Sequence, residues 1–451
     1  MNTKPNDVKR WTGRVTCVLF ACGAAACGAG SGDTSSTRAA LNVDVAAAAH
    51  APGHDRRALA PNTRFYVRPP STAATKQLTD LLRSRQFADA RRLAQMEETP
   101  EAVWFTGGSP DDVEAAVRKT MRRAESENRV PVLVAYDVPF RDCGEYSAGG
   151  ALDTASYEAW IDGFARGIGN DRAVVILEPD GLGLIPYNTT IFGAAESCKP
   201  TVTDAQGNAV PAPGATPADR YAQLNYAVDS VEGKAPRARV YLDGSHSAWL
   251  GVGEAAYRLH AAGVERAQGF FLNVSNYQSS SDNTLFGTWV SDCLAAVGNP
   301  SSWGAGHFDW CPGQYDPAQN YAVNFSPEYA ATVTAALQSM MAGASATTAF
   351  VIDTSRNGQG PWTPTAAYSD PQTWCNPPGR GVGRRPTAAT AVPLLDAYLW
   401  IKIPGESDGA CNRGVTGSTT DPEWGGIGDP AAGDWFPQQA AQLAALAAPA
   451  F

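Results

Sequence analysis

Seven short apolar runs recur along the chain and form the clearest pattern in the sequence. Within each run the apolar residues follow one another instead of alternating with polar ones, which is typical of strands buried on both faces. We therefore predict seven interior strands. The runs are AVWFTG (102–107), VPVLVAY (130–136), AVVILEP (173–179), ARVYLDG (238–244), GFFLNVS (269–275), TAFVIDTS (348–355) and YLWIKIP (398–404).

Segments with helical periodicity lie between these runs. Ser109 is predicted to cap the first helix, just ahead of Pro110, and Ser156 to start the second. Strands and helices that alternate this often indicate a parallel β/α architecture. An open doubly wound sheet is the alternative, but no glycine-rich phosphate loop follows the first strand. The predicted helices are PDDVEAAVRKTMRRAESE (110–127), ASYEAWIDGFARGIG (155–169), DRYAQLNYAVDSVEG (219–233) and PEYAATVTAALQSMMAG (327–343).

Two long loop-rich insertions interrupt the pattern, at about 278–324 and 408–434. Loops of this length are generally either functional or disordered. The cysteines and tryptophans inside them favour ordered lids, and we expect these tryptophans to be buried. They are Trp289, Trp303, Trp310, Trp424 and Trp435.

The first 29 residues are predicted to be an export signal, in which basic residues precede the apolar stretch VTCVLFACGAAACGA. Cys22 and Cys27 each end a segment similar to a bacterial lipoprotein processing site, and ordinary cleavage after a nearby alanine is the alternative. Residues 30–61 are predicted to be a disordered linker. The expected location is therefore outside the cytoplasm, as a secreted protein or as an outer-membrane lipoprotein at the cell surface.

Composition and charge narrow the class of partner. The 451 residues carry a formal net charge of −10, whereas nucleic-acid-binding proteins present basic faces. A neutral substrate, or simple solubility, fits this acidic charge better. Only 18% of the residues are charged, which suits a loop-rich extracellular protein. Nothing in the sequence implies a protein partner, so we expect a monomer that binds no nucleic acid.

Cysteine counting predicts disulfides. Three of the nine cysteines lie in the leader, and an even set of six in an exported chain indicates three bridges. None of the six forms a CxxC pair and the five histidines show no zinc spacing, so we predict no metal site and no cofactor. The six are Cys143, Cys198, Cys293, Cys311, Cys375 and Cys411.

Three aspartates stand just past predicted strands. Asp142 follows the second run in YDVPFRDCGEYSAGG, Asp180 follows the third in VVILEPDGLGLIP, and Asp408 follows the last in IKIPGESDG. The C-terminal ends of parallel β/α strands carry the chemistry of such folds. Two carboxylates there suit acid–base hydrolysis of a sugar, because one must give a proton while the other stays charged. Polar residues that merely end strands are the alternative interpretation.

One motif is set aside. GESDG fits the G-x-S-x-G pattern with Ser407 as a nucleophile. That mechanism needs a histidine later in the chain, and the last histidine is His307. A serine hydrolase is therefore not expected.

Taken in order, seven segments resemble the motifs of glycoside hydrolase family 6. They are YDVPFRDC, ILEPDGL, VYLDGSHSAWLG, FLNVSNY, VIDTSRNG, TWCNPPGRGVG and LWIKIPGESDG. The resemblance covers residues 62–449 and identifies 62–451 as the catalytic domain. That family contains inverting cellulases, so the resemblance implies an α/β fold: a distorted seven-stranded parallel β/α barrel, TIM-like, with long disulfide-linked loops over the active site.

The resemblance assigns roles to the three aspartates. Asp180 would be the general acid that protonates the glycosidic oxygen. Asp142 would keep the pKa of Asp180 high and help to organise the attacking water. Asp408 stands at the position proposed for the base. Inversion implies acid and base carboxyl groups about 6.5–9.5 Å apart.

The resemblance also implies sugar contacts. Trp104, Trp249 and Trp374 would stack glucosyl units, with core packing as the alternative, whereas Trp160 and Trp400 are expected in the core.

Polar contacts follow from the same motifs. Lys402 and Glu406 would bind hydroxyl groups, and a plain ion pair between them is the alternative. Tyr136 would press on a distorted sugar ring, and Ser147 lies in the loop that covers the acid. The matching motifs also contain His246, Asn276, Asp243 and Arg356.

Two departures from the family pattern stand near Trp249. DGSH replaces DAGH at 243–246, and Val252 replaces a second tryptophan of some members, which affects the far acceptor subsite rather than the chemistry.

By resemblance Cys143 pairs with Cys198 and Cys375 with Cys411, and the remaining Cys293 and Cys311 then form the third pair. Each bridge is expected to fasten a loop over the cleft. Such a roof favours a cellobiohydrolase that releases cellobiose from non-reducing ends of cellulose or cello-oligosaccharides. The alternatives are an endo-β-1,4-glucanase with an open cleft and a catalytically silent glucan-binding barrel.

Overall fold

The computed structural model describes residues 59–451. The predicted export signal, with Cys22 and Cys27, and the predicted linker up to residue 58 lie outside the described residues. Within residues 59–451, no helix combines the length and the apolar character that a membrane span requires.

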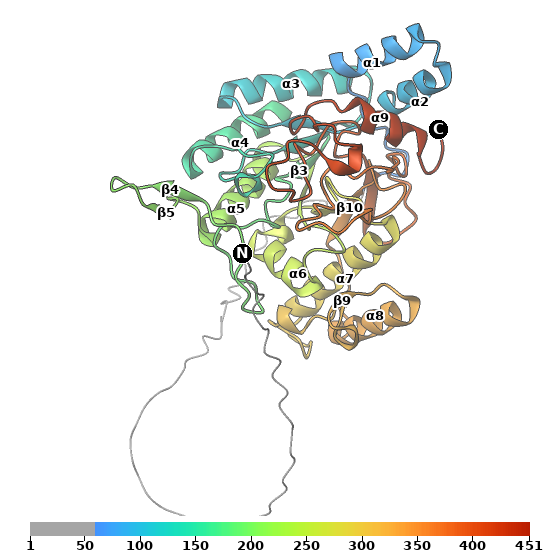
Figure 1. The fold of residues 1–451 in the computed structure, drawn as a ribbon. Helices are drawn as coiled ribbons and strands as arrows, with labels where there is room; N and C mark the ends of the chain where they lie inside the picture. Colours follow the sequence, from blue (N-terminus) through green and yellow to red (C-terminus); the bar gives the residue numbers. More distant parts are fainter. Residues whose placement is uncertain (1–58) are drawn as a thin grey trace, which may run out of the picture. The chain divides into compact units, whose positions relative to one another are not determined.

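All seven predicted strands form, and they lie in one parallel sheet in chain order (Figure 1). The predicted distorted β/α barrel is confirmed. The strands are β1 (Val103–Phe105), β2 (Val132–Ala135), β3 (Ala173–Leu177), β6 (Ala238–Asp243), β7 (Gly269–Leu272), β10 (Ala349–Asp353) and β11 (Leu395–Leu399).

The two edges of this sheet meet without strand pairing in the described part of the chain. Ala102 N donates to Trp400 O at 2.9 Å, and Trp104 Nε1 donates to Ile401 O at 2.8 Å. These bonds join the edges β1 and β11, so the barrel is distorted and only partly closed.

The last strand ends earlier than predicted, at Leu399 instead of residue 404. Ile401 N and Lys402 N donate to the carboxylate of Asp353, at 3.2 and 2.9 Å. Because a side chain takes the bonds that a neighbouring strand would take, the backbone leaves the sheet here and carries Lys402 toward the strand ends.

The four predicted helices form and are joined by two further helices between strands. Three more helices lie near the ends of the described chain. The helices are α1 (Thr72–Arg83), α2 (Phe87–Glu97), α3 (Pro110–Ser126), α4 (Thr154–Ile168), α5 (Pro217–Lys234), α6 (Val252–Ala261), α7 (Ser280–Gly298), α8 (Pro327–Met341) and α9 (Pro437–Ala445).

Helix starts follow local capping chemistry. Ser109 caps α3 as predicted, in a capping box with Asp112. The second helix starts earlier than predicted, because Asp153 caps α4 by accepting a hydrogen bond from Ser156 N at 2.8 Å. Ser156 is therefore inside the first turn rather than at its start.

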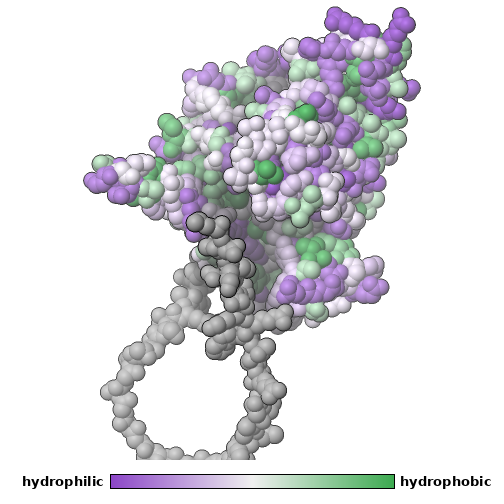
Figure 2. Space-filling model, in the orientation of Figure 1, coloured by the Kyte–Doolittle hydropathy of each residue, from purple (hydrophilic) through white to green (hydrophobic). Residues whose placement is uncertain are grey.

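Alternate residues of the strands face two separate cores. Leu133 and Val175 pack with the surrounding helices, whereas Val134 and Ile176 pack with other strands inside the barrel. This explains the continuous apolar runs, since both faces of the sheet are covered. In Figure 2 the hydrophobic residues on the visible face of the described part occur only in small scattered groups.

The first insertion is less loop-like than predicted. Helix α7 takes up much of 278–324, because Ser279 caps it and Trp289 is fully buried. The following segment runs outside the helical layer, so Trp303 and Trp310 are 56% and 48% exposed and the prediction that they are buried is wrong.

The other tryptophans follow expectation more closely. Trp160 and Trp400 lie in the core, each 1% exposed. In the second insertion Trp424 and Trp435 are partly buried and donate to Asn376 O and Gln77 Oε1.

Two small antiparallel pairs were not predicted, since each of their strands has only two or three residues. They are β4 (Thr201–Thr203) with β5 (Ala209–Pro211), and β8 (Tyr315–Asp316) with β9 (Ala322–Val323).

The structure contains the three expected disulfides, Cys143–Cys198, Cys293–Cys311 and Cys375–Cys411. The first joins the segments that follow β2 and β3, and the third joins those that follow β10 and β11. The second differs from expectation: Cys293 lies on α7 and both sulfurs are buried in the core beneath the helices. It fastens the outer layer and not a loop over the strand ends.

Candidate active site

Asp180 and Asp142 lie on loops that leave neighbouring strands at the C-terminal end of the sheet. Asp180 follows β3 and Asp142 follows β2. Both residues have left-handed backbone conformations, with φ of +62° and +55°. Such conformations are uncommon for residues other than glycine and concentrate at functional sites.

The electrostatics of the two carboxyl groups favour retention of a proton. Burial raises the pKa of Asp180 well above its usual range, and the carboxylates of Asp243, Asp142 and Asp408 raise it further. Burial also raises the pKa of Asp142, to about 6, although Ser147 N donates to its Oδ2 at 2.6 Å. Among residues 59–451 no group donates a hydrogen bond to the Asp180 carboxyl, which leaves its proton available.

Two buried carboxylates hold the backbone that carries these aspartates. Glu178 accepts hydrogen bonds from the N–H groups of residues 137 and 138, at 3.0 to 3.1 Å. Asp243, at the end of β6, accepts from the N–H groups of residues 182 and 183, at 3.1 and 3.0 Å. Some acidic residues at the strand ends therefore serve to hold the backbone. Glu178 is one of them, and it was not predicted as a site residue although it stands in the EPD motif.

One buried arginine links the two acid-bearing loops. Arg220, on α5, donates to Pro139 O at 2.8 Å and to Gly181 O at 2.7 Å. It is 2% exposed, and burial lowers its pKa to about 10. Sequence reasoning missed this residue, because its only signal is an arginine within a predicted helix.

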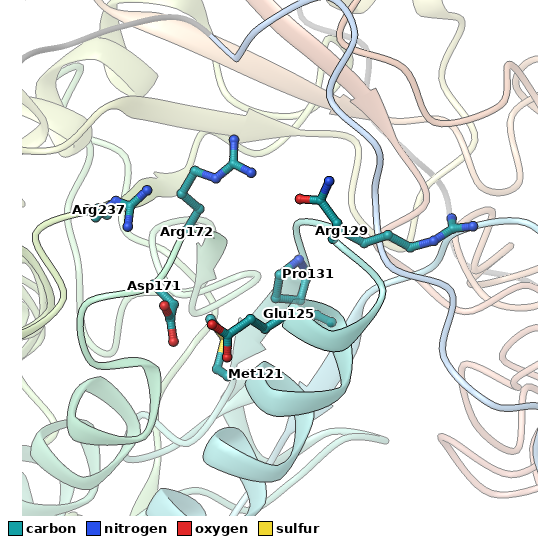
Figure 3. Close-up of a pocket in the computed structure, with 9 residues that line it drawn as sticks. Met121, Glu125, Arg129, Pro131, Asp171, Arg172 and Arg237 are labelled. Atoms are coloured by element: carbon teal, nitrogen blue, oxygen red, sulfur yellow. The ribbon is translucent and has the colours of Figure 1, made fainter.

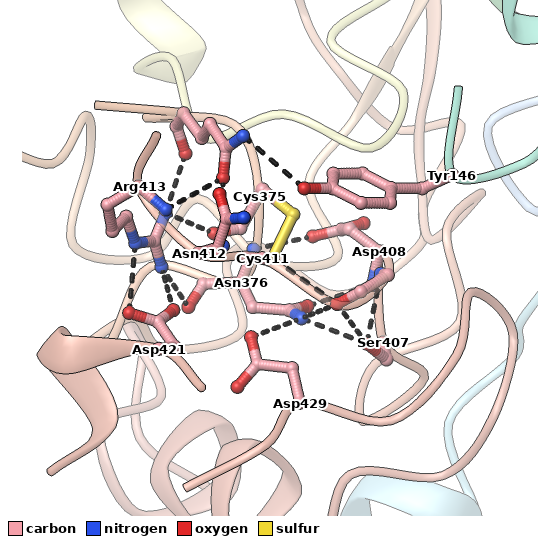
Figure 4. Close-up of a disulfide and its surroundings, with 12 residues drawn as sticks. Tyr146, Cys375, Asn376, Ser407, Asp408, Cys411, Asn412, Arg413, Asp421 and Asp429 are labelled. Atoms are coloured by element: carbon pink, nitrogen blue, oxygen red, sulfur yellow. Dashed lines mark hydrogen bonds and ion pairs between the residues drawn. A yellow bond between two sulfur atoms is a disulfide. The ribbon is translucent and has the colours of Figure 1, made fainter. Parts of the chain in front are cut away.

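Asp408 lies in a buried polar network beside the Cys375–Cys411 disulfide (Figure 4). Arg356 Nη1 is 2.8 Å from Asp408 Oδ2, and Lys402 Nζ is 3.8 Å from Oδ1. Asn376 N also donates to Oδ2, at 3.0 Å. Two cations and a backbone donor thus compensate the negative charge of this carboxylate.

Tyr136 and Trp104 lie beside the acid pair at the ends of β2 and β1. Their rings meet edge to face with centroids 5.4 Å apart, and the Arg141 guanidinium lies 4.6 Å from the Tyr136 ring centre. Burial raises the pKa of Tyr136, and the charges of Asp180 and Asp142 raise it further. The structure therefore brings Tyr136, Asp142 and Asp180 together.

Trp249 and His246 lie against the Asp180 loop on its other side. A Cβ added to Gly183 would come within 2.4 Å of the Trp249 indole, so only glycine permits this packing. The His246 ring centre is 5.7 Å from that of Trp249, and His246 Nδ1 accepts a hydrogen bond from Ala248 N. Burial lowers the pKa of His246 to about 3, which keeps the imidazole neutral.

Lys402 and Glu406 lie next to Asp408 but do not form the ion pair that was the alternative interpretation. Lys402 Nζ donates to Ser407 O at 3.1 Å and approaches Asp408. No ion pair within 4 Å joins Lys402 to Glu406 in residues 59–451. Burial raises the pKa of Glu406 and lowers that of Lys402.

Trp374 and Asn276 complete the predicted set. The Trp374 ring centre is 5.8 Å from that of Tyr146, which belongs to the loop containing Asp142. Asn276 Oδ1 accepts from Tyr277 N and from Gln278 Nε2, and Tyr277 OH lies 3.4 Å from Asp408 Oδ2.

Ser407 has the surroundings of a structural residue. Its side chain is fully buried, its Oγ donates to Pro430 O, and Asn376 Nδ2 donates to Oγ. These bonds tie the Ser407 hydroxyl to the surrounding loops.

One group of possible metal ligands occurs among residues 59–451, formed by Cys411, Asp421 and Asp429. The Cys411 sulfur is bonded to Cys375, and Asp421 pairs with the buried Arg413. These partners leave the group poorly suited to hold a cation.

A cavity of about 180 Å³ lies at the opposite end of the barrel (Figure 3). Pro131 and Arg172 line it from positions just before β2 and β3, with Arg129 and Arg237 beside them. It contains no predicted site residue, and in β/α barrels chemistry belongs to the C-terminal ends of the strands.

Comparison with known proteins identifies related enzymes. Residues 60–447 match the model of glycosyl hydrolases family 6. Endoglucanase A of Cellulomonas fimi is 32% identical over 385 residues, which cover 85% of this chain and 61% of the relative. The 1,4-β-D-glucan cellobiohydrolase CEL6A of Pyricularia oryzae is 27% identical over 403 residues, which cover 84% of this chain and 69% of the relative.

A solved structure of an endoglucanase is also similar to this chain. The endoglucanase Cel6 of Mycobacterium tuberculosis, in complex with methyl-cellobiosyl-4-deoxy-4-thio-β-D-cellobioside, is 31% identical with a TM-score of 0.57. The match covers 85% of this chain and 97% of that chain.

Proposed function

Because this chain belongs to glycosyl hydrolase family 6, we propose that it hydrolyses β-1,4-glucosidic bonds in cellulose and cello-oligosaccharides. The observation that carries the proposal is Asp180. Its carboxyl group has a strongly raised pKa, no hydrogen-bond donor among residues 59–451, and Asp142 as a neighbour. A carboxyl whose pKa is raised by burial and by neighbouring carboxylates suits a general acid, which must hold a proton to give.

The proposed reaction inverts the anomeric carbon. Asp180 gives its proton to the glycosidic oxygen as the bond to that carbon breaks, and water attacks the opposite face. Asp142 supports the protonated state of Asp180 and helps to orient the water. Asp408 takes the base position, beside the cationic side chains of Arg356 and Lys402.

The proposed sugar platforms lie on both sides of the acid. Trp104 and Tyr136 lie where β1 and β2 end, and Trp249 packs on the Asp180 loop. Pyranose faces are apolar and stack on such rings, while their hydroxyl groups need polar partners. We assign that polar role to Lys402, Glu406, His246 and Asn276, and we place Trp374 and Ser147 in the wall of the cleft.

Release of cellobiose from chain ends is the mode that the loops favour. Tyr146, from the loop after β2, contacts Trp374, and Gln372 Nε2 donates to Tyr146 OH at 3.3 Å. These contacts bridge the loops that follow β2 and β10, as expected for a roof that makes a glucan enter by its end.

An endoglucanase is the second candidate, and the relatives favour it. Endoglucanase A of Cellulomonas fimi is 32% identical, against 27% for the Pyricularia oryzae cellobiohydrolase. An open cleft would cut chains internally. A catalytically silent glucan-binding barrel is a weaker candidate, because Asp142, Asp180 and Asp408 are all present.

We place the enzyme outside the cytoplasm, as a monomer without a protein partner. Three disulfides suit an oxidising compartment, and the acidic surface charge gives no attraction to nucleic acid.

Product analysis over time on cellohexaose and swollen cellulose tests the proposal, with Asp180→Ala as control. Early cellobiose that is absent with the variant is expected. A spread of cellotriose and cellotetraose would identify an endoglucanase. Binding of cellohexaose without any cleavage by the wild type would contradict an enzymatic role.

A further inference from the structure

The segment after α7 exposes aromatic side chains that the proposed chemistry does not use. Trp303 is 56% exposed and Trp310 is 48% exposed. Large aromatic side chains bury a substantial apolar area when they have the opportunity, so their exposure on one short segment calls for a binding role.

The two indoles are held in a common orientation. Their planes differ by 25° with centres 6.4 Å apart, and the His307 ring stacks on Trp310 at 3.8 Å with planes only 6° apart. His307 therefore backs one face of Trp310. A pyranose ring stacks on the face of an indole, so side chains held in a fixed orientation suit a sugar ligand.

The indole N–H groups of the two exposed tryptophans are free to bond a ligand. Trp303 and Trp310 donate to no protein group among residues 59–451, and the same holds for Trp249, Trp362 and Trp374. Six other described tryptophans donate Nε1 to the protein; they are Trp104, Trp160, Trp289, Trp400, Trp424 and Trp435.

This segment is continuous with the acceptor side of the candidate cleft. Tyr315 OH donates to Trp249 O at 2.6 Å, and Gln314 Nε2 donates to Leu250 O at 2.9 Å. The Cys293–Cys311 bridge anchors the same segment to α7. Trp303 itself lies near the C-terminal ends of α7 and α8, since Gly304 packs against Met340 and Asn299 Nδ2 donates to Met341 O, so the surface lies outside the cleft.

The charge of the segment selects a neutral ligand. Residues 299–326 contain only two charged side chains, Asp309 and Asp316, among 28 residues. Nucleic acids and anionic membranes attract basic surfaces, which this segment does not offer. Aromatic rings among uncharged amides and hydroxyls suit a polysaccharide.

We propose that Trp303 and Trp310 form an accessory binding surface for β-1,4-glucan chains of solid cellulose, outside the catalytic cleft. The inference rests on the proposed function, because its ligand is the proposed substrate. The surface would hold the enzyme on the solid beside the chain being cut.

Adsorption isotherms on microcrystalline cellulose at 4 °C test this inference. We compare Asp180→Ala, which cannot hydrolyse the solid, with Asp180→Ala carrying Trp303→Ala and Trp310→Ala. Loss of two aromatic platforms is expected to weaken binding by about tenfold. Phe87→Ala in the same background is the matched control, since Phe87 is 62% exposed on α2. Each single tryptophan variant is expected to show a smaller loss and replaces the pair if the pair does not fold.

Two further readouts separate the possible outcomes. In the active enzyme, the tryptophan variants are expected to lose at least about five times more activity on cellulose than on cellohexaose. Unchanged isotherms, an equal loss with Phe87→Ala, or an equal loss of adsorption to polystyrene beads would overturn the inference. Failure of the wild type to cleave cellohexaose would instead count against the proposed function, and the isotherms would still report on the surface.

Discussion

At the scale of single residues, the site depends on carboxyl groups whose surroundings differ. Asp180 has raised pKa and no donor among the described residues, whereas Asp408 contacts Arg356 and Lys402. Asp142 has one backbone donor and a pKa of about 6. The proposed roles of the three aspartates rest on these different contacts.

Asp142→Asn should move the alkaline limb of activity to lower pH. In the proposed mechanism Asp180 acts when protonated, so activity should disappear as the pH rises through its pKa. The charge of Asp142 helps to raise that pKa, and the neutral amide removes this help. We also expect kcat to fall by about 10²-fold, because the attacking water loses a partner. The measurement is kcat on cellohexaose from pH 4 to 9.

Glu145→Gln is the control for this experiment. Glu145 is exposed and also raises the pKa of Asp180, but it is the last of the groups that do so. Glu145→Gln should therefore shift the alkaline limb of activity less than Asp142→Asn does. An alkaline limb that stays in place with Asp142→Asn would mean that Asp142 does not tune the acid.

At the scale of elements, helices and strand ends fix the loops that carry the acid pair. Arg220 reaches from α5 to the carbonyls of Pro139 and Gly181, and Glu178 holds the backbone after β2. The left-handed conformations of Asp142 and Asp180 are thus maintained by contacts from distant segments. This support keeps the carboxyl groups in place without substrate.

Arg220→Met should destabilise the protein and disable the site together. The change leaves two buried carbonyls without a donor and the buried Glu178 without a nearby cation, at an expected cost of about 3 kcal/mol. We expect kcat on cellohexaose to fall more than about tenfold, because misplacement of catalytic groups is costly. Urea unfolding measures the change in the free energy of unfolding, and initial rates on cellohexaose measure the change in kcat.

Arg172→Met is the matched control, since Arg172 is exposed at the other end of the barrel. Its effect on the free energy of unfolding should stay within about 0.5 kcal/mol. Equal stability of the two variants would show that Arg220 does not hold the loops.

The sheet was predictable from sequence because a strand that is buried on both faces consists of consecutive apolar residues, which can be recognised locally. Asp142, Asp180 and Asp408 were predictable as candidates, since each directly follows such a run in a recognisable motif. Arg220 was not, because its partners lie 39 and 81 residues away. The exposure of Trp303 was missed for a related reason: burial depends on where the segment runs across the helical layer, and residue type does not encode that path.

At the scale of the whole molecule, several buried carboxyl groups make stability depend on pH. Burial raises the pKa of Glu101 to about 8, and raises that of Glu178 and of Asp429 to about 7. An unfolded carboxyl has a pKa of about 4. Between these values the folded state binds more protons than the unfolded state, so stability falls as the pH rises.

The melting temperature should therefore be lower at pH 8 than at pH 5.5. Glu101→Gln should reduce this difference, because it removes the carboxyl with the highest of these pKa values while Arg68 keeps an oxygen partner. Glu98→Gln is the control, since Glu98 is exposed on the same segment. Calorimetry at the two pH values provides the comparison. A melting temperature that rises between pH 5.5 and pH 8 would contradict the predicted sign.

The mode of attack is also a property of the whole molecule, because it depends on whether the loops that follow β2, β10 and β11 meet over the cleft. Tyr146 contacts Trp374, accepts from Gln372, and lies so close to Gly409 that a Cβ there would be 2.5 Å from Tyr146 Cβ. If this contact closes the cleft, opening it should admit the middle of a chain as well as its end.

Tyr146→Ala should then shift the enzyme toward internal cuts. We expect the loss of viscosity of carboxymethyl cellulose, per unit of soluble sugar released, to rise by several-fold. Tyr368→Ala is the control, because Tyr368 OH donates to Glu423 and, among residues 59–451, no hydrogen bond or ring contact joins Tyr368 to the loop that carries Tyr146. The opposite result is a wild type that already shows a large loss of viscosity per unit of soluble sugar, with a ratio that Tyr146→Ala leaves unchanged. This result would mean that the loops meet beside the glucan path and not over it. The enzyme would then cut internally, as the names of its endoglucanase relatives imply, and the disulfides would serve to hold the catalytic aspartates.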